Sequence, residues 1–468
     1  MEITSSAPTP LDELVARLGA DRVLSGERIN PDDLHDESLH PRKRTPLAVV
    51  RPRSTEEVAE TARFASRHSL AIVPRGSGTG LSGGVTPVGG GLVVSFSEMN
   101  QVLHVDERDH VAVVQPGVTL NELEAVLSTT SLRYPVYPGE MSGSLGGNVN
   151  TNAGGMRAVR HGVTRQHVLG LELVLIDGTV LRTGGSVVKS SSGYDLTQLI
   201  VGSEGTLAMV TEVTLKLSPR FEHGATVLVP FATLEAVTGV VPDIISSGLN
   251  PSILEYLDLL TMSTVTTRAG LDLGVDQRVS AAATAYLIIV LETRTRQQLD
   301  ADIESLAELL DQAGALETYV LSTGVAHRLI EGREQVFWAS KEAGVNDIID
   351  IVVPRSVVPQ FLADVGLIAQ RHGCLAGGCG HVGDGNVHLF VLQSDDVKRQ
   401  GFLDELFAHG VAVGGAVSGE HGIGIDKQRP YLNLVDANLL ALQRGIKNLF
   451  DPRSLLNPYR LLDDRPLP

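Results

Sequence analysis

The chain has 468 residues, which is too long for one hydrophobic core, so at least two domains are expected. The formal net charge of −17 argues against nucleic acid as a partner, because binding to phosphates requires clustered Lys and Arg. The sequence has no run of about 18 apolar residues, so we expect no membrane-spanning helix. The N-terminus lacks the basic start and apolar core of a signal peptide, which together with the low cysteine content favours a cytoplasmic location.

Apolar residues recur at helical spacing over residues 10–20, and a second helix is expected to start after Ser54. Ser54 has the side chain of an N-cap, and Glu57 stands where it would complete a capping box. This helix is expected to run to about His68, followed by a strand over residues 70–73 that enters a glycine-rich loop. Short β-branched runs between Gly and Pro turns then predict an α+β domain that ends near Pro219, with strands over residues 92–96, 111–115, 171–176 and 210–217.

The pattern changes after residue 220. Strands over residues 225–229 and 285–291 alternate with amphipathic helices over residues 299–313 and 358–372, which predicts a second α+β domain. The tail from residue 403 is mostly helical. We therefore expect three parts, over residues 1–220, 221–402 and 403–468. The two cysteines, Cys374 and Cys379, are expected to be small buried residues.

The loop Gly76–Gly84 contains the pattern G-x-G-x-x-G after a predicted strand, as NAD-binding folds do. In those folds the motif opens a helix whose N-terminus faces the pyrophosphate. Here Pro87 and three further glycines follow, a composition in which no helix survives. A nicotinamide site is therefore disfavoured. Successive backbone N–H groups, with Arg75 close by, can still form a nest for a phosphate group.

Two later segments, residues 138–155 and 201–207, have the same character. They offer small residues, hydroxyls and amides with almost no bulk. A flat ring system and its diphosphate could lie directly on such a backbone. The alternative for the first loop alone is a purely structural turn, and the two later segments make that alternative weaker.

Taken together, the three segments over residues 74–84, 146–155 and 202–206 resemble the FAD-binding PCMH-type domain of the vanillyl-alcohol oxidase / p-cresol methylhydroxylase superfamily. The closest resemblance is to the branch with the glycolate oxidase catalytic subunit, D-lactate dehydrogenase and D-2-hydroxyglutarate dehydrogenase, and it covers essentially the whole chain. It implies an α+β protein with a two-part FAD-binding domain over residues 1–220. It also implies a substrate domain with a mainly antiparallel sheet over residues 221–402 and a helical segment that returns to the flavin over residues 403–468.

The resemblance implies that FAD is bound without a covalent bond, because Thr79 stands where covalent members of the superfamily carry a histidine. The FAD-binding candidates in the glycine-rich segments are Arg75, Gly76, Ser77, Gly78, Thr79, Gly80, Ser82, Gly83, Pro138, Gly139, Gly143, Ser144, Gly146, Gly147, Asn148, Thr151, Asn152, Gly154, Gly155 and Glu204. Asn457, outside these segments, is a further candidate for contact with the flavin or the substrate.

A histidine pair flanks a predicted hairpin in the second domain. Asp384 and Gly385 between apolar runs predict a two-residue type I′ turn. In that register His381 lies directly opposite His388, with Cβ atoms about 4.5–5.5 Å apart. A longer loop would change the register and still let the imidazoles converge. Such a pair can share a metal ion, and the alternative is a pair of ordinary hydrogen-bonded histidines.

A second polar motif, Glu420 followed by His421, is embedded in glycines over residues 418–424, where the chain can sit tightly against a ligand. In the family that the chain resembles, the two hairpin histidines and this glutamate bind a divalent metal, and the next histidine is the catalytic base. The resemblance therefore implies that His381, His388 and Glu420 are metal ligands and that His421 is the base. A His₂Glu set with open positions suits Zn²⁺ or Mn²⁺.

The resemblance further implies oxidation of a small D-2-hydroxy acid, of the D-lactate, glycolate or D-2-hydroxyglutarate type, to the 2-keto acid, with a hydride passing from C2 to flavin N5. The family places an Arg shortly after a Trp to hold the substrate carboxylate. Here Lys341 follows Trp338, and Lys lacks the bidentate fork of Arg, so Arg333 and Arg355 are alternatives. Asn386 is a further candidate for contact with the substrate.

Three other functions stay open at this level: a flavin oxidase of an alcohol or sugar without a carboxylate, an FAD-carrying subunit of a larger oxidase complex, and a metal-binding hydrolase without flavin. The electron acceptor is not indicated by the sequence. A homodimer is also left open.

Overall fold

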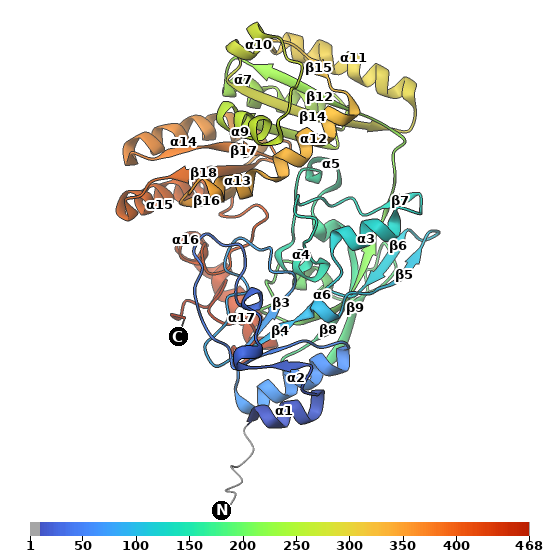
Figure 1. The fold of residues 1–468 in the computed structure, drawn as a ribbon, viewed down its shortest axis with the longest axis vertical. Coiled ribbons are helices and arrows are strands. Elements are labelled where there is room, and N and C mark those ends of the chain that lie inside the picture. The colour runs from blue at the N-terminus through green and yellow to red at the C-terminus, as the bar shows by residue number, and fades with distance from the viewer. Residues whose placement is uncertain (1–9, 468) are drawn as a thin grey trace, which may run out of the picture.

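A computed structural model describes residues 10–467 of the chain. Figure 1 shows two lobes: the first part of the chain and the C-terminal helices α16 (Gln428–Leu434) and α17 (Ala437–Phe450) form the lower lobe, and the middle of the chain forms the upper lobe. Helices and mainly antiparallel sheets make up both lobes, which confirms the α+β prediction. Residues 1–6, on which the signal-peptide expectation rests, lie outside the described part. Within residues 10–467 no helix is long and apolar enough to cross a bilayer.

The lower lobe contains two main sheets. The first has the order β1-β2-β4-β3, in which β2, β4 and β3 run parallel and β1 pairs antiparallel with β2. The second has the order β5-β6-β10-β8-β9 and is antiparallel throughout. The strands are β1 (Val23–Leu24), β2 (Ala48–Val50), β3 (Ile72–Arg75), β4 (Leu92–Ser95), β5 (Val102–Asp106), β6 (Val111–Val114), β8 (Val168–Val174), β9 (Val180–Gly184) and β10 (Met209–Lys216), with β7 (Leu132–Arg133) and β11 (Ser218–Pro219) paired separately.

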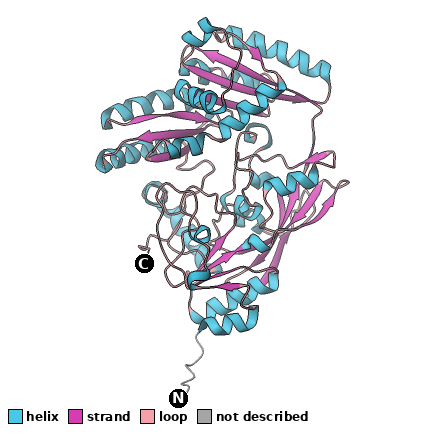
Figure 2. Cartoon of the chain, in the orientation of Figure 1, coloured by secondary structure: helices cyan, strands magenta, loops and turns pink. Residues whose placement is uncertain are grey.

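The upper lobe is built on one seven-stranded antiparallel sheet with the order β15-β12-β14-β13-β17-β18-β16. The long strands of this sheet are the magenta arrows at the top of Figure 2. The strands are β12 (His223–Phe231), β13 (Ile253–Asp258), β14 (Ala285–Thr293), β15 (Tyr319–Val320), β16 (Asp347–Val352), β17 (Leu375–Gly380) and β18 (Asn386–Leu392).

Helices complete both lobes. Those of the lower lobe are α1 (Pro10–Leu18), α2 (Thr55–His68), α3 (Leu120–Leu127), α4 (Leu145–Thr151), α5 (Ala158–His161) and α6 (Leu196–Ile200). Those of the upper lobe are α7 (Leu234–Gly239), α8 (Val241–Ser246), α9 (Leu259–Ala269), α10 (Gln277–Ala282), α11 (Arg296–Gln312), α12 (Thr323–Glu334), α13 (Val336–Glu342), α14 (Val358–His372) and α15 (Asp396–Ala412).

Helices cover one face of the seven-stranded sheet and half of the other. Apolar side chains of α7, α8, α11, α14 and α15 pack on the first face, against residues such as Ile289 and Leu389. Apolar side chains of α9, α12 and α13 pack on the second face, near Leu257 and Cys379. The remaining half of the second face belongs to β16, β17 and β18, and it lines a cavity together with residues of the lower lobe. The active-site candidates lie on this half.

The helix α2 begins where the sequence predicts it, but its capping box is incomplete. The hydroxyl of Ser54 accepts a hydrogen bond from the Glu57 N–H at 3.3 Å, as an N-cap does. The Glu57 carboxylate accepts from the N–H of Arg53 at 2.7 Å instead of returning to Ser54. The predicted strands and helices of both lobes otherwise occur with end shifts of a few residues.

The two glycine-rich segments differ from one another in structure. The chain after β3 forms a loop up to β4 with no helix, which confirms that the motif of Gly76–Gly84 is not a dinucleotide fingerprint. The second segment, in contrast, contains α4, a short helix that the sequence did not predict. Ser144 N-caps it by accepting from the Gly147 N–H, and this cap compensates for the poor helix propensity of the glycines in its first turn.

The C-terminal part returns to the lower lobe. The N–H of Ile72 donates to Leu455 at 2.8 Å, and the N–H of Asn457 donates back to Ile72 at 2.7 Å. The expected boundary after residue 402 falls inside α15, which packs on α14 of the upper lobe, so it needs correction. The returning segment begins after α15, because the hydrophobic face of that helix belongs to the core of the seven-stranded sheet.

Candidate active site

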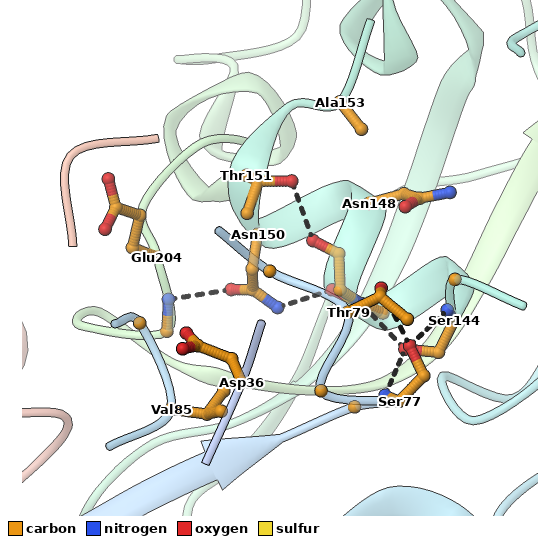
Figure 3. A pocket seen from close by; sticks show the side chains of 18 of the residues that line it. Asp36, Ser77, Thr79, Val85, Ser144, Asn148, Asn150, Thr151, Ala153 and Glu204 are labelled. Carbon is orange, nitrogen blue, oxygen red and sulfur yellow. Dashed lines mark hydrogen bonds between the residues drawn. The ribbon is translucent and has the colours of Figure 1, made fainter. Parts of the chain in front are cut away.

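A long cavity runs along the glycine-rich segments of the lower lobe and encloses about 1290 Å³ of empty space, its open mouth included. One wall is the loop that follows Arg75 at the end of β3. The facing wall is α4 with the chain before it. Figure 3 shows Ser77 and Thr79 on the first wall next to Ser144 on the second, with Glu204 at the other side of the cavity.

Direct hydrogen bonds join these two walls. The N–H of Ser77 donates to the Ser144 hydroxyl at 3.1 Å, and the N–H of Ser144 donates to the Ser77 hydroxyl at 3.0 Å. A Cβ atom at Gly76 would collide with the Ser144 hydroxyl, so this close approach requires glycine. The glycines therefore let the two backbone segments approach closely, and the backbone of both segments lines the cavity.

Several buried polar atoms of the cavity-lining residues have no hydrogen-bond partner within the protein. Buried polar groups are almost always hydrogen-bonded, so such atoms point to a ligand. They include both donors and acceptors, as an adenine dinucleotide with ribityl and ribose hydroxyls requires. The residues present thus fit FAD. The atoms are Asp36 Oδ2, Arg75 Nε, Asn148 Nδ2 and Asn457 Oδ1.

The segment that carries Glu420 and His421 is fastened to the walls of the long cavity. The buried carboxylate of Glu204 accepts from the N–H groups of Ile423 and Gly424, each at 2.7 Å. The hydroxyl of Ser82 donates to the carbonyl oxygens of His421 at 3.2 Å and Gly422 at 3.1 Å. The lower lobe therefore fixes the position of this segment beside its own cavity.

His381, His388 and Glu420 converge on one point. Ligand atoms of the three residues lie within 4.8 Å of one another. Glu420 Oε1 is 3.1 Å from His381 Nε2 and 3.4 Å from His388 Nε2. His381 Nδ1 binds Glu255 on β13, so a carboxylate fixes this ring from behind, as is typical of metal-binding histidines. Two imidazole nitrogens and a carboxylate with an open side fit a divalent cation.

Asp350 on β16 is the carboxylate that organises this segment. It accepts from the backbone N–H groups of Gly419, Glu420 and His421 and from the ammonium of Lys427, at 2.8–3.2 Å. Burial alone would raise the pKa of Asp350, but Lys427 and His421 hold it well below its usual value. Asp350 also lies near His388 and His421. Because its oxygens already accept so many donors, we assign it to positioning and not to metal binding.

The three histidines have different electrostatic settings. Burial lowers the pKa of His421, so its imidazole is neutral at neutral pH and can accept a proton. Burial and the charge of His381 hold the pKa of His388 well below its usual value. Burial also opposes charge on His381, but Glu255 and Glu420 raise its pKa well above the usual value. In the absence of a metal ion, a protonated His381 supplies the positive charge that balances the carboxylate of Glu420.

Two family models match the chain: the FAD binding domain over residues 46–184, and the C-terminal domain of FAD linked oxidases over residues 220–461. The chain belongs to the FAD-linked oxidases. An uncharacterized FAD-linked oxidoreductase of Mycobacterium tuberculosis is 49% identical to this oxidase over 97% of the chain and 100% of its own length. A D-lactate dehydrogenase of Anaerostipes hadrus is 34% identical over 94% of both chains. The structure of p-cresol methylhydroxylase, 16% identical, superposes with a TM-score of 0.76 over 97% of this chain and 96% of the other, which shows a common fold.

In this FAD-linked oxidase most of the residues that the sequence assigned to FAD line the long cavity. Those that do are Arg75, Gly76, Ser77, Gly78, Thr79, Gly80, Ser82, Pro138, Gly143, Ser144, Gly146, Gly147, Asn148, Thr151, Gly154, Glu204 and Asn457. Gly139 lines a second cavity, and Gly83, Asn152 and Gly155 lie outside the lining of the long one. Gly155 has a positive φ of 121° and no room for a Cβ atom beside Tyr137, so its role is structural.

Some lining residues of the oxidase were missed by sequence reasoning. Asn150 lies within the second glycine-rich segment, so its position was a usable signal; its amide donates to Gly146 and its oxygen accepts from the Gly205 N–H at 2.9 Å. Asp36 lies far from every motif, and only the fold brings it to the cavity. Burial raises the pKa of Asp36 to about 6.

The predicted type I′ hairpin is wrong in its register. β17 ends at Gly380 and β18 begins at Asn386, so the connection has five residues, and His388 pairs with Cys379 instead of His381. The longer turn is closed by the N–H groups of Asp384 and Asn386, which donate to the carbonyl of His381. The two imidazoles still converge, with ring centroids 4.8 Å apart. Both cysteines are free and buried, as expected.

A second cavity, with about 1120 Å³ of empty space, lies between the lobes and shares Thr79, Glu420 and His421 with the first. Neither Lys341 nor Asn386 lines it, and both substrate assignments need correction. The amide of Asn386 donates to Asp350 at 2.7 Å and to the carbonyl of Ile351 at 3.1 Å, so it supports the organising carboxylate.

The three residues considered for binding the substrate carboxylate lie in different surroundings. Lys341 projects to the lower lobe and pairs with Glu37 at 2.6 Å. Arg355 is exposed on the short helix after β16. Arg333 at the end of α12 lines the second cavity and pairs with the buried carboxylate of Glu255, which lies 3.0 Å from its Nε and 2.9 Å from its Nη2. Of these three candidates, Arg333 is the one that lines the second cavity.

Proposed function

We propose that this FAD-linked oxidase converts a small D-2-hydroxy acid to the 2-keto acid, with a non-covalently bound FAD and a divalent metal. The observation that carries the proposal is the position of Glu420 and His421, which line both the FAD cavity and the second cavity. A substrate in the second cavity would lie next to the flavin and next to the His381–His388–Glu420 set. The resemblance to a D-lactate dehydrogenase supports this substrate class.

The long cavity provides the place for FAD. When bound, FAD accepts the hydride that leaves C2 of the substrate. Backbone N–H groups of the glycine-rich walls and the amide of Asn148 supply donors for its diphosphate. Thr79 lies where covalent relatives carry their histidine, and its hydroxyl lies 3.3 Å from the Ser77 hydroxyl. A threonine hydroxyl so placed offers no ready nucleophile, which supports non-covalent binding.

The metal ligands we propose are His381, His388 and Glu420. A divalent cation there, Zn²⁺ or Mn²⁺, supplies Lewis acidity that makes the substrate hydroxyl more acidic. The carboxylate of Glu255 holds the far nitrogen of His381 and fixes which ring nitrogen faces the site. Burial and the charge of His381 hold the pKa of His388 well below its usual value, so its ring is neutral and keeps a lone pair for coordination.

His421 is the proposed base for the hydroxyl proton. Its ring stacks at 5.3 Å on that of His388, and its Nδ1 is 3.9 Å from Asp350. Burial keeps the ring neutral, and Asp350 stabilises the imidazolium that forms when the proton arrives. Arg333 would hold the substrate carboxylate, so that C2 is presented toward the flavin side of the cavity.

The geometry of the site supports two alternative functions less well. An FAD-carrying accessory subunit has no need for a metal set and a base at one point, yet His381, His388, Glu420 and His421 come together here. A flavin oxidase of a non-carboxylate alcohol has no need for an arginine in the substrate cavity. Arg333 therefore favours an acid.

The assignment of His421 is tested by His421→Ala in the FAD-loaded protein. The variant is expected to keep its flavin spectrum and to lose about 100-fold or more in kcat, the usual contribution of a general base. His327→Ala, at a histidine paired with Glu331 on the surface of α12, is the control and is expected to turn over normally. Turnover of His421→Ala within a few-fold of the parent would remove it as the base.

A further inference from the structure

One face of the seven-stranded sheet carries the metal set and an apolar row side by side. Asp350 pairs with His388, and Cys379 pairs with His388 from the other side. Two residues further along the strands, Ile348 pairs with Phe390. Residues two apart on a strand point to the same face and are separated by about 7 Å. A molecule held at His388 therefore meets Ile348 and Phe390 next, on the same surface.

Gly377 on β17 pairs with Phe390 and adds no side chain to this row; the space that a Cβ atom would need there is taken by the carboxylate of Asp258. Phe390 and Ile348 are both partly exposed and line the second cavity, although they are among the most apolar residue types. Apolar side chains left open in a cavity favour apolar ligand groups.

The other walls of the second cavity carry further apolar side chains, next to polar ones such as Glu140 and Gln335. Met141 and Met156 come from the lower lobe, and Phe337 and Trp338 come from α13. The rings of Phe337 and Trp338 pack edge to face with centroids 5.1 Å apart. Methionines and aromatic rings adapt to branched or aromatic ligand groups.

The charged groups of this cavity are unevenly distributed. Among the described residues that line it, Arg333 is the one Lys or Arg, whereas Glu140, Glu334 and Glu420 are acidic. Lys341 lies outside the lining, where it is neutralised by Glu37. Arg333 already pairs with Glu255, so this cavity offers at most this one guanidinium to a substrate carboxylate and no cation to a second carboxylate. Removing a second carboxylate from water without a partner is costly.

From this arrangement we propose that the substrate of this oxidase is a monocarboxylic 2-hydroxy acid with an apolar side chain larger than that of lactate, branched or aromatic. Its carboxylate would face Arg333 and its side chain would lie over Ile348 and Phe390. This inference rests on the proposed function and narrows it: glycolate, D-lactate and D-2-hydroxyglutarate become poor substrates of the same site.

The test is anaerobic reduction of the FAD-loaded protein by glycolate, D-lactate, D-2-hydroxyisocaproate, D-3-phenyllactate and D-2-hydroxyglutarate, followed by kcat/KM with an artificial acceptor. We expect D-2-hydroxyisocaproate or D-3-phenyllactate to be at least about tenfold better than D-lactate, since each buried methylene contributes about tenfold. Glycolate, D-lactate or D-2-hydroxyglutarate as the best substrate would overturn the inference and leave the proposed function intact. Failure of all five to reduce the flavin would overturn both.

Two variants test the apolar row itself. Phe390→Ala is expected to lower the ratio of kcat/KM for D-3-phenyllactate to that for D-lactate by about tenfold, because the larger side chain loses its contact. Ile348→Arg is expected to raise the ratio for D-2-hydroxyglutarate to D-3-phenyllactate, because it supplies the missing cation. Leu375→Ala, at a residue of β17 that is 71% exposed, is the control. Unchanged ratios in both variants, with the flavin spectrum retained, would refute the assignment.

Discussion

The N–H of His421 donates to Asp350 Oδ2 at 2.8 Å, so the residue that we propose as the base is fixed through its backbone by a buried carboxylate on β16. The same carboxylate receives the N–H groups of the two preceding residues and the hydroxyl of Ser418. One ionised side chain thus holds the turn that carries both the proposed metal ligand Glu420 and the proposed base His421. Its loss should affect chemistry without removing any group that touches the substrate.

Asp350→Asn tests this. The amide would present N–H groups to backbone N–H groups and to Lys427, and hydrogen bonds to a charged acceptor are each worth about 1.5–3 kcal/mol. We expect a lower Tm and a fall in kcat of about 100-fold, with the flavin retained, since mispositioning alone can cost that much. Asp364→Asn, at a half-buried carboxylate paired with His409, is the control for loss of a surface ion pair. Normal kcat in Asp350→Asn would contradict the positioning role.

The metal content of the purified protein tests the proposed ligands His381, His388 and Glu420. The purified protein is expected to contain one divalent ion per chain, measured by elemental analysis, and His388→Ala and Glu420→Gln are expected to lose it. A chelator should abolish flavin reduction by the substrate, and Zn²⁺ or Mn²⁺ should restore it. His327→Ala should retain the metal, because this histidine is exposed, pairs with Glu331 and is not one of the proposed ligands. Full metal content in both site variants would exclude these ligands.

A pH effect on substrate binding should arise from Glu334. Burial raises its pKa to about 7, and it lines the second cavity, where we propose that the substrate binds and where the Tyr137 hydroxyl donates to it. Below pH 7 the carboxyl is neutral; above pH 7 its charge repels an anionic substrate, so KM should rise. Because its pKa in the folded state is raised, its contribution to stability is likewise present at low pH and lost as the pH rises through 7. The KM of Glu334→Gln should depend less on pH between 6 and about 8; an identical profile would exclude Glu334 as the cause.

The contact between Glu204 and the segment that carries Glu420 and His421 should govern cofactor retention. Glu204→Ala leaves the N–H groups of Ile423 and Gly424 without an acceptor in a buried place, at about 1–3 kcal/mol each. We expect a lower Tm and faster FAD release, measured by flavin fluorescence. Glu212→Ala, which breaks only an ion pair with exposed Arg182, is the control. FAD release at the parental rate would show that the hydrogen bonds to Glu204 do not contribute to FAD retention.

The sequence was informative where chemistry is local. The glycine-rich walls, the absence of a helix after Gly84, and the residues His381, His388, Glu420 and His421 were all found from composition, spacing and resemblance. These features depend on backbone freedom and residue type, which neighbouring residues in the chain reveal.

The groups that the sequence did not reveal act across long separations. Glu255 on β13 binds the ring of His381, and Asp350 on β16 accepts hydrogen bonds from a turn about 70 residues further along the chain. The hairpin register failed because the turn was extended to five residues by bonds to the His381 carbonyl, which no dipeptide signal encodes. The position of Lys341 after Trp338 suggested a substrate contact, but its direction depends on Glu37 of the other lobe.

The central claim is that a 2-hydroxy acid reduces the flavin of this oxidase at a metal-dependent site. The most direct measurement is the visible spectrum of the FAD-loaded protein under anaerobic conditions, before and after addition of D-2-hydroxyisocaproate or D-lactate, with and without a chelator. We expect the oxidised flavin bands to bleach, an equal amount of 2-keto acid to form, and the chelator to prevent both, while propane-1,2-diol has no effect. A flavin that stays oxidised with each acid, or that the diol bleaches equally well, would contradict the claim.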